Sequence, residues 1–194
     1  YGGNPGWRDV NKFALHQGFD SIEGEVEIQK KLTSTVLEKH DWGIFDEDLF
    51  KYIEVTLAEA TTPQLLVVMT TTNHPPYQLP KSYHSLSLEW SKDLESRLII
   101  DKNLALDRFK TYQYSNEQMG QFLTRIKSSP LGQRTIIAST ADHGFMVINF
   151  NESEQLQKWN VPFYLYIPDK IAEGRSFTND KFFANSNGIT KKQL

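Results

Sequence analysis

Strand-length apolar runs, alternating with segments of helical pattern, are the feature that most limits what this chain can fold into. Runs such as Leu65–Met69 are short, apolar and rich in β-branched residues, and turn-forming residues end them. We expect strands at Phe19–Ile22, Gln64–Thr70, Thr135–Ser139 and Val161–Ile167. Apolar residues recur at helical spacing in Arg8–Gln17, Asp46–Ala60 and Leu104–Lys127. This order predicts an α/β fold, a sheet with helices on both faces.

Composition excludes several classes of protein. The 194 residues suit a single domain, and their net charge of −3 gives no support to a nucleic-acid partner. The absence of cysteine excludes disulfides, zinc ribbons and thiol catalysis. No apolar run approaches the roughly 18 residues that a membrane-spanning helix needs. The first residues, Tyr1-Gly2-Gly3, resemble neither an initiator segment nor a signal peptide, so we expect the chain to begin within a domain.

Asp142-His143-Gly144 is the sharpest chemical motif and directly follows a predicted strand. A carboxylate beside an imidazole can bind a divalent metal, and glycine permits a tight turn behind them. Ligands of α/β sheets bind beyond the carboxyl ends of strands. Taken alone, the tripeptide is more often an ordinary solvated turn, so its context must decide.

His74 lies at a similar position, after the run Gln64–Thr70, in the segment Asn73-His74-Pro75-Pro76-Tyr77. Two prolines stiffen this loop, and a histidine held there can donate a hydrogen bond to a phosphate or sulfate oxygen. A rigid turn with an incidental histidine explains the segment equally well.

Trp7-Arg8 is a third candidate. A guanidinium forks onto phosphate, and an indole packs against a small polyol. Without further context, a helix that begins at Arg8 with Trp7 packed beneath it is the commoner arrangement. The remaining histidines, His16, His40 and His84, have no chemical neighbours in the sequence and are interpreted as structural or solvated.

These motifs occur in the order found in one family. The chain resembles the sulfatase-like catalytic domain of lipoteichoic acid synthases and related phosphoglycerol transferases, in the alkaline phosphatase superfamily. The resemblance extends from Tyr1 to about Pro168, and each motif alone is weak, whereas the ordered series is specific. The matching segments are Tyr1-Gly2-Gly3, Trp7-Arg8-Asp9, Gly18-Phe19-Asp20, Asp41-Trp42-Gly43-Ile44, Asp46–Phe50, Thr72–Tyr77, Tyr114–Leu123, Ala141–Gly144 and Val161-Pro162-Phe163.

The resemblance implies a role for each matching position. Asp142 and His143 would be two ligands of a divalent metal, most suitably manganese, with magnesium and zinc as alternatives. His74 would be the catalytic residue that contacts the transferred phosphoryl group or the leaving oxygen. Trp7 and Arg8, which the family often spaces differently, would bind phosphoglycerol together with His74.

The chain also departs from the family pattern. The family places a threonine nucleophile and a further acidic metal ligand before the segment that matches Tyr1-Gly2-Gly3. Asn116 stands where an aspartate is usual, and Ser186-Asn187-Gly188-Ile189 matches a later family segment without its histidine and aspartate. Residues 1–194 are therefore expected to form the C-terminal part of one sulfatase-like domain that is incomplete at its N-terminus.

The activity implied is metal-dependent transfer of a phosphoglycerol group from a lipid headgroup through a phospho-threonine intermediate. Family members are anchored in the cell membrane with the catalytic domain outside the cytoplasm, and the expected partner is a phospholipid or glycerol-phosphate substrate. This chain alone would be inactive, because it lacks the nucleophile. Two alternatives stay open: a sulfatase or phosphodiesterase hydrolase, and a non-catalytic module that binds glycerol phosphate.

Overall fold

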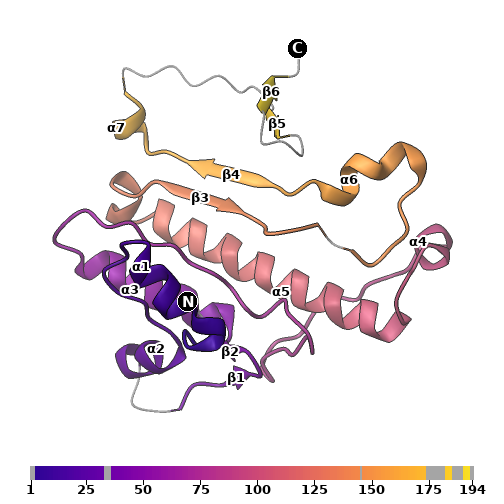
Figure 1. The fold of residues 1–194 in the computed structure, drawn as a ribbon, viewed down its shortest axis with the longest axis horizontal. Helices are drawn as coiled ribbons and strands as arrows, with labels where there is room; N and C mark the ends of the chain where they lie inside the picture. The colour runs from indigo at the N-terminus through magenta and orange to yellow at the C-terminus, as the bar shows by residue number, and fades with distance from the viewer. Residues whose placement is uncertain (1–2, 33–35, 145, 174–181, 185–189, 193–194) are drawn as a thin grey trace.

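Two long helices form the centre of the molecule in the computed structural model, which describes residues 3–32, 36–144, 146–173, 182–184 and 190–192. Helix α3 covers Asp46–Glu59 and helix α5 covers Lys102–Lys127, as their apolar spacing predicts. Phe50 of α3 stacks on Phe122 of α5, with ring centroids 4.9 Å apart. Helix α2, Glu25–Leu32, packs against α3 and adds the fully buried Ile28 to the same core. Helices α2, α3 and α5 together form one layer, and α5 runs along its length in Figure 1.

Charged and polar residues at the helix ends explain where α3 and α5 begin. Asp46, Glu47 and Asp48 occupy the first turn of α3, where carboxylates interact favourably with the helix dipole. The Asp101 side chain accepts hydrogen bonds from the backbone N–H groups of Asn103 and Leu104 and so caps α5. Helix α5 continues without interruption through Asn116, whose side chain bonds back to the Tyr112 carbonyl.

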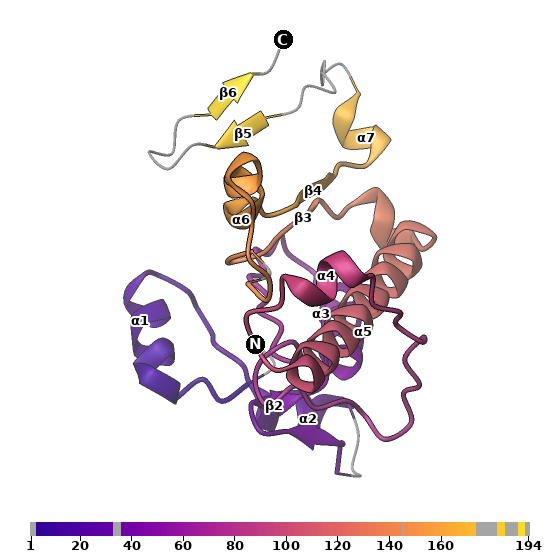
Figure 2. The ribbon, with the colours of Figure 1, turned by 90° about the vertical axis from the view of Figure 1, so that its right-hand side faces the viewer.

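The N-terminal helix is shorter than the sequence predicts. A 3₁₀ turn at Trp7–Asp9 precedes α1, Val10–His16, because Arg8 and Asp9 have φ values of 49° and 57°. These left-handed conformations prevent a regular helix from starting at Arg8. The predicted stop at Gly18 is confirmed by its φ of 90°. Helix α1 lies to one side of the central helices in Figure 2.

The strands form antiparallel pairs. Strand β3, Ile137–Thr140, pairs with β4, Phe163–Tyr166, in the register Ala138↔Leu165 and Thr140↔Phe163. A small hairpin joins β1, Lys39–His40, to β2, Gly43–Ile44, and a third pair joins β5, Phe182–Ala184, to β6, Thr190–Lys192. The remaining elements are α4 (Lys92–Ser96), η2 (Pro130–Gln133), η3 (Glu152–Glu154), α6 (Gln155–Trp159) and α7 (Asp169–Ala172).

Two predicted strands are not formed. Residues 19–22 and 64–70 have no ladder of backbone hydrogen bonds with any other segment that the structure describes. A strand is defined by its partner, so an apolar run without a neighbour stays a single extended segment. Residues 64–70 nevertheless keep the alternation of a strand: Leu66 and Val68 pack on the core, whereas Leu65, Val67 and Met69 are exposed.

The fold class is α/β, as the sequence predicts. In the described part of the chain, Ile137 attaches one face of the β3–β4 pair to the helical core. Register and alternation place Phe163 and Leu165 on the opposite face with Ala138. Phe163 and Leu165 are 66% and 52% exposed, so this second face presents apolar side chains to solvent.

Candidate functional site

Three aromatic rings from distant parts of the sequence lie in a row. The Trp7 and Trp42 ring centroids are 5.5 Å apart in an edge-to-face arrangement, and the Trp42 and His74 centroids are 4.1 Å apart. The Arg8 guanidinium lies 4.8 Å from the Trp7 ring centroid. The predicted site residues Trp7, Arg8 and His74 are thus brought together, and Trp42 joins them. We call these four residues the ring cluster.

Tight turns hold the Trp7-Arg8 end of the ring cluster. The Trp7 N–H donates to the Asn4 carbonyl, and Arg8 takes its left-handed conformation in the next turn. Gly3 lies against the Trp42 backbone, since a β-carbon at Gly3 would be 2.6 Å from the Trp42 carbonyl oxygen. The glycine therefore allows the N-terminal segment to reach the β1–β2 hairpin. Trp7 remains 47% exposed, so its ring is available to a ligand.

The loop that carries His74 is fixed from below by buried polar groups. The Thr72 hydroxyl donates to Asp46 Oδ1 at 2.8 Å and accepts from the Asp46 N–H at 3.0 Å. Asp46 Oδ1 also lies 3.3 Å from the Thr72 nitrogen. Asn73 Oδ1 accepts from the Thr111 hydroxyl of α5 at 2.9 Å. Both α3 and α5 therefore anchor the residues that lead into His74.

The far side of the same loop is bonded to the β1–β2 hairpin. The Trp42 indole N–H donates to the Pro75 carbonyl at 2.6 Å, and the Asp41 N–H donates to Gln78 Oε1 at 2.9 Å. His74 Nδ1 lies 3.0 Å from the same Pro75 carbonyl. A carbonyl only accepts, so this contact assigns a proton to Nδ1 and leaves the lone pair of the neutral ring on Nε2.

His40 supports Trp42 from within. It is 6% exposed, accepts the Trp42 N–H on Nδ1 at 3.3 Å, and contacts the Thr71 hydroxyl through Nε2 at 3.3 Å. Burial lowers the pKa of His40 below its usual 6.5, and the charge of Asp46 partly opposes that shift. His40 is structural, one of the two interpretations that the sequence left open.

Trp42 is the residue of the ring cluster to which sequence reasoning assigned no role. Its motif, Asp41-Trp42-Gly43, was part of the family resemblance but carried no chemistry of its own. The signal lay in Gly43, whose φ of 140° permits the hairpin that turns the indole toward the His74 loop.

Asp142 and His143 follow the carboxyl end of β3, as predicted. Asp142 Oδ1 accepts the His143 N–H at 2.9 Å, and His143 Nδ1 lies 2.9 Å from the Gly144 carbonyl. The other two atoms, Asp142 Oδ2 and His143 Nε2, are 3.7 Å apart. The two side chains are 88% and 53% exposed. Oxygen and nitrogen donors with free lone pairs at this separation fit two adjacent ligands of one divalent metal.

Gly144 permits this turn because of its neighbours. A β-carbon there would lie 2.4 Å from the Lys158 carbonyl of α6. Any larger residue would push the Asp142-His143 turn away from α6.

The metal ligand set within the described residues is partial. No group of three or more His, Asp or Glu side chains that could hold a metal occurs in the parts of the chain that the structure describes. Ser186–Ile189, the segment compared above with a later family motif, lies outside the described residues.

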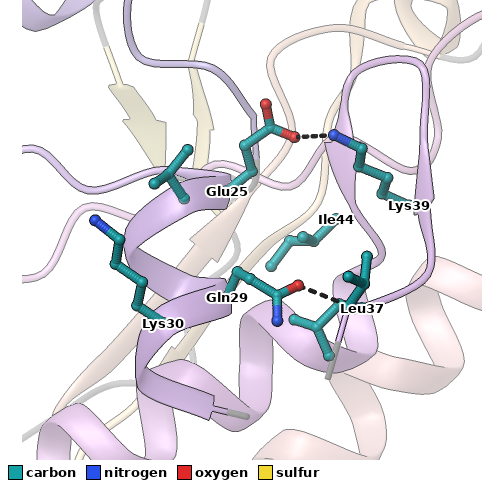
Figure 3. A pocket seen from close by; sticks show the side chains of 8 residues that line it. Glu25, Gln29, Lys30, Leu37, Lys39 and Ile44 are labelled. Atoms are coloured by element: carbon teal, nitrogen blue, oxygen red, sulfur yellow. Dashed lines mark hydrogen bonds and ion pairs between the residues drawn. The ribbon is translucent and has the colours of Figure 1, made fainter. Parts of the chain in front are cut away.

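A separate open groove of about 570 Å³ lies between α2 and the β1–β2 hairpin (Figure 3). Glu25 and Lys39 form an ion pair of 3.3 Å across it, and the Leu37 N–H donates to Gln29 Oε1 at 2.6 Å. None of the predicted site residues lines this groove. Glu25, Lys39 and Gln29 are already engaged in these contacts, and we assign the groove no function.

Known proteins are similar to this chain in sequence and in fold. The sequence model of the sulfatase family matches residues 1–191. Phosphoglycerol transferase I of Salmonella typhi is 23% identical over 147 residues, which cover 73% of this chain and 18% of that protein. A Vibrio parahaemolyticus crystal structure of a protein in the alkaline phosphatase superfamily aligns with a TM-score of 0.63 and 24% identity. That alignment covers 87% of this chain and 37% of the other. The chain thus spans well under half the length of either protein.

Proposed function

Because the chain belongs to the sulfatase family, we propose that it forms the phosphoglycerol-binding and part of the metal-binding surface of a phosphoglycerol transferase. The observation that carries this proposal is the ring cluster. The pair Trp7-Arg8 is distant in sequence from His74, yet Trp42 joins them into one surface. The similarity to phosphoglycerol transferase I of Salmonella typhi supports the same assignment.

The ring cluster suits a phosphoglycerol group on physical grounds. Arg8 would pair with the phosphate oxygens through its forked N–H groups, and the exposed Trp7 ring would pack against the carbon atoms of glycerol. His74 Nε2 would receive or give the proton of the oxygen that leaves or attacks. A cation, an indole and an imidazole therefore match a ligand with a charged end and a short polyol.

Asp142 Oδ2 and His143 Nε2 would hold the divalent metal, for which manganese is our proposal and magnesium and zinc are alternatives. When bound, the metal would neutralise charge on the phosphoryl oxygens and lower the pKa of a nearby hydroxyl. The chain's own contribution is to fix the two donors: Oδ1 and Nδ1 are held by the backbone, so each ligand presents its other atom.

The reaction that we propose for the whole protein has two displacements. The threonine hydroxyl loses its proton and attacks phosphorus, the bond between phosphorus and the lipid alcohol breaks, and that alcohol takes up a proton. An acceptor hydroxyl then loses its proton and attacks the phosphorus of the phospho-threonine, and the threonine oxygen leaves and takes up a proton. The family places that threonine before the segment that matches Tyr1-Gly2-Gly3. We accordingly propose that residues 1–194 form the C-terminal part of the catalytic domain and do not complete this reaction alone.

The proposed setting is the outer side of a cell membrane, where a lipid donor is available. No helix in the described residues is both long and apolar enough to cross a bilayer. A second candidate function is hydrolysis of a sulfate ester or phosphodiester, which the sulfatase family match favours. A third is a non-catalytic module that binds glycerol phosphate, since the ring cluster could bind this ligand without catalysis.

Calorimetric titration of the chain with sn-glycerol 1-phosphate tests the binding part of the proposal. Arg8→Ala removes a charged hydrogen-bonding group and should weaken binding roughly 10- to 100-fold. Lys12→Ala is the matched control, because it removes a nearby cation that Asp9 already engages at 2.8 Å. Equal losses from both variants would mean that net charge, and not the Arg8 fork, governs binding.

A further inference from the structure

Trp42 is linked to His74 by a direct ring contact and by a carbonyl oxygen that both side chains approach. Its ring lies against the imidazole, with centroids 4.1 Å apart and an interplanar angle of 56°. Its indole N–H donates to the Pro75 carbonyl at 2.6 Å, the same oxygen that His74 Nδ1 approaches at 3.0 Å. One carbonyl therefore receives both the indole and the imidazole.

Trp42 is itself held in place. Its backbone N–H is bonded to the buried His40, and the β1–β2 pairing His40↔Gly43 closes the hairpin around it. The carbonyl of Trp42 lies against Gly3, and its ring meets the edge of Trp7 at 5.5 Å. A residue fixed on both sides can impose an orientation on a neighbouring side chain.

His74 has few other constraints. It is exposed, and in the described residues no hydrogen bond is formed by its Nε2. The ring therefore depends on the Pro75 carbonyl and on the Trp42 face to select between its two tautomers.

We propose that Trp42 is a positioning residue: it fixes the His74 imidazole so that Nδ1 carries the proton and Nε2 faces the phosphoglycerol group. The identity of the group at Nε2 rests on the proposed function. The tautomer does not, because the contacts among Trp42, Pro75 and His74 determine it. Trp42 acts through His74 and does not take part in the bond changes.

The His74 tautomer can be tested by nitrogen NMR of the histidine rings in the 194-residue chain. This measurement reports directly which nitrogen of each imidazole is protonated. In the wild type, His74 should be protonated on Nδ1 when neutral. Trp42→Ala removes the ring and the N–H and should abolish that preference, with affinity for sn-glycerol 1-phosphate falling about tenfold through lost orientation. Trp42→Phe keeps a ring but loses the N–H, so the tautomer preference should weaken and remain detectable.

Trp159→Phe is the control, since it removes an indole that is 67% exposed. The Trp42→Phe variant keeps the test valid if Trp42→Ala does not fold. A wild-type His74 protonated on Nε2 would overturn the proposal, as would a tautomer unchanged in both Trp42 variants. If the tautomer responds as expected but glycerol phosphate does not bind even the wild type, positioning stands and the proposed substrate class fails.

Discussion

Two imidazoles of this chain are held through the same nitrogen. His74 and His143 each place Nδ1 close to a backbone carbonyl, that of Pro75 and that of Gly144, and so keep Nε2 available. His40 is held differently, because its Nδ1 accepts the Trp42 N–H. The first two suit proton transfer and metal binding, whereas the third suits support of a hairpin.

His40 should make stability depend on pH. Burial lowers its pKa below 6.5 in the folded state, so below pH 6.5 the unfolded chain takes up a proton that the folded chain does not. The His40 contribution is fully present above pH 6.5 and is lost as the pH falls through the lowered folded pKa. Urea unfolding measured between pH 7.5 and 5 should show this loss, and His40→Gln should flatten it. A His40→Gln variant that keeps the wild-type slope would refute the assignment to His40.

At the scale of elements, the sequence predicts the helices whose positions are set by a periodic apolar pattern. Helices α3 and α5 agree with their predicted limits to within two residues, because a wide apolar stripe at 3.6-residue spacing has few other solutions. The same reasoning fails at Arg8, whose left-handed φ depends on local turns that no apolar pattern records. It also predicts a strand at residues 64–70 that is not formed. Their side chains alternate as in a strand, but no described segment pairs with them.

The candidate site likewise combines residues that a local sequence pattern indicates with one that only tertiary contacts reveal. Asp142, His143 and His74 were named as site residues because each follows an apolar run that predicts a strand, and their roles stay predictions; only the run before Asp142 forms a strand, β3. Trp42 was not named, because its role arises from contacts with Pro75 and His74, more than 30 residues away. A tertiary contact of this kind leaves no periodic trace in one sequence.

The Asp46–Thr72 pair joins helix α3 to the loop that carries His74, and removing either side chain should lower the free energy of unfolding. Thr72→Val keeps the shape of the side chain but leaves the buried Asp46 carboxylate short of a donor, so unfolding should need about 1–3 kcal/mol less. Asp46→Ala should cost on the order of 3 kcal/mol, because it leaves both the hydroxyl and a backbone N–H unpaired. Denaturant titration measures both changes. If Thr72→Val costs less than about 0.5 kcal/mol, the range of an inconsequential surface change, the pair does not anchor the loop.

At the scale of the whole molecule, one side of the extended segment 64–70 is exposed to solvent in the described structure. Val67 is 63% exposed, whereas its neighbour Val68 packs on the core. An extended apolar segment with unpaired edges favours association with other chains. We therefore expect the isolated chain to self-associate at high concentration.

Val67→Ser and Val68→Ser form a matched pair for this expectation. Val67→Ser should reduce self-association in light scattering and change stability by less than about 0.5 kcal/mol. Val68→Ser should cost on the order of 2 kcal/mol, because it removes core contacts and buries a hydroxyl. Similar stability losses from both variants would contradict the alternating burial of residues 64–70.

We propose that the ring cluster and the Asp142-His143 pair belong to one site. Manganese is paramagnetic and broadens the NMR signals of nearby nuclei, so titrating it into the labelled chain tests this claim directly. Signals of His143 should broaden first, and those of the Trp42 indole and the His74 ring should follow, since one small-ligand site spans roughly 10 Å. Broadening that is confined to Asp142 and His143, with Trp42 and His74 unaffected, would contradict a shared site.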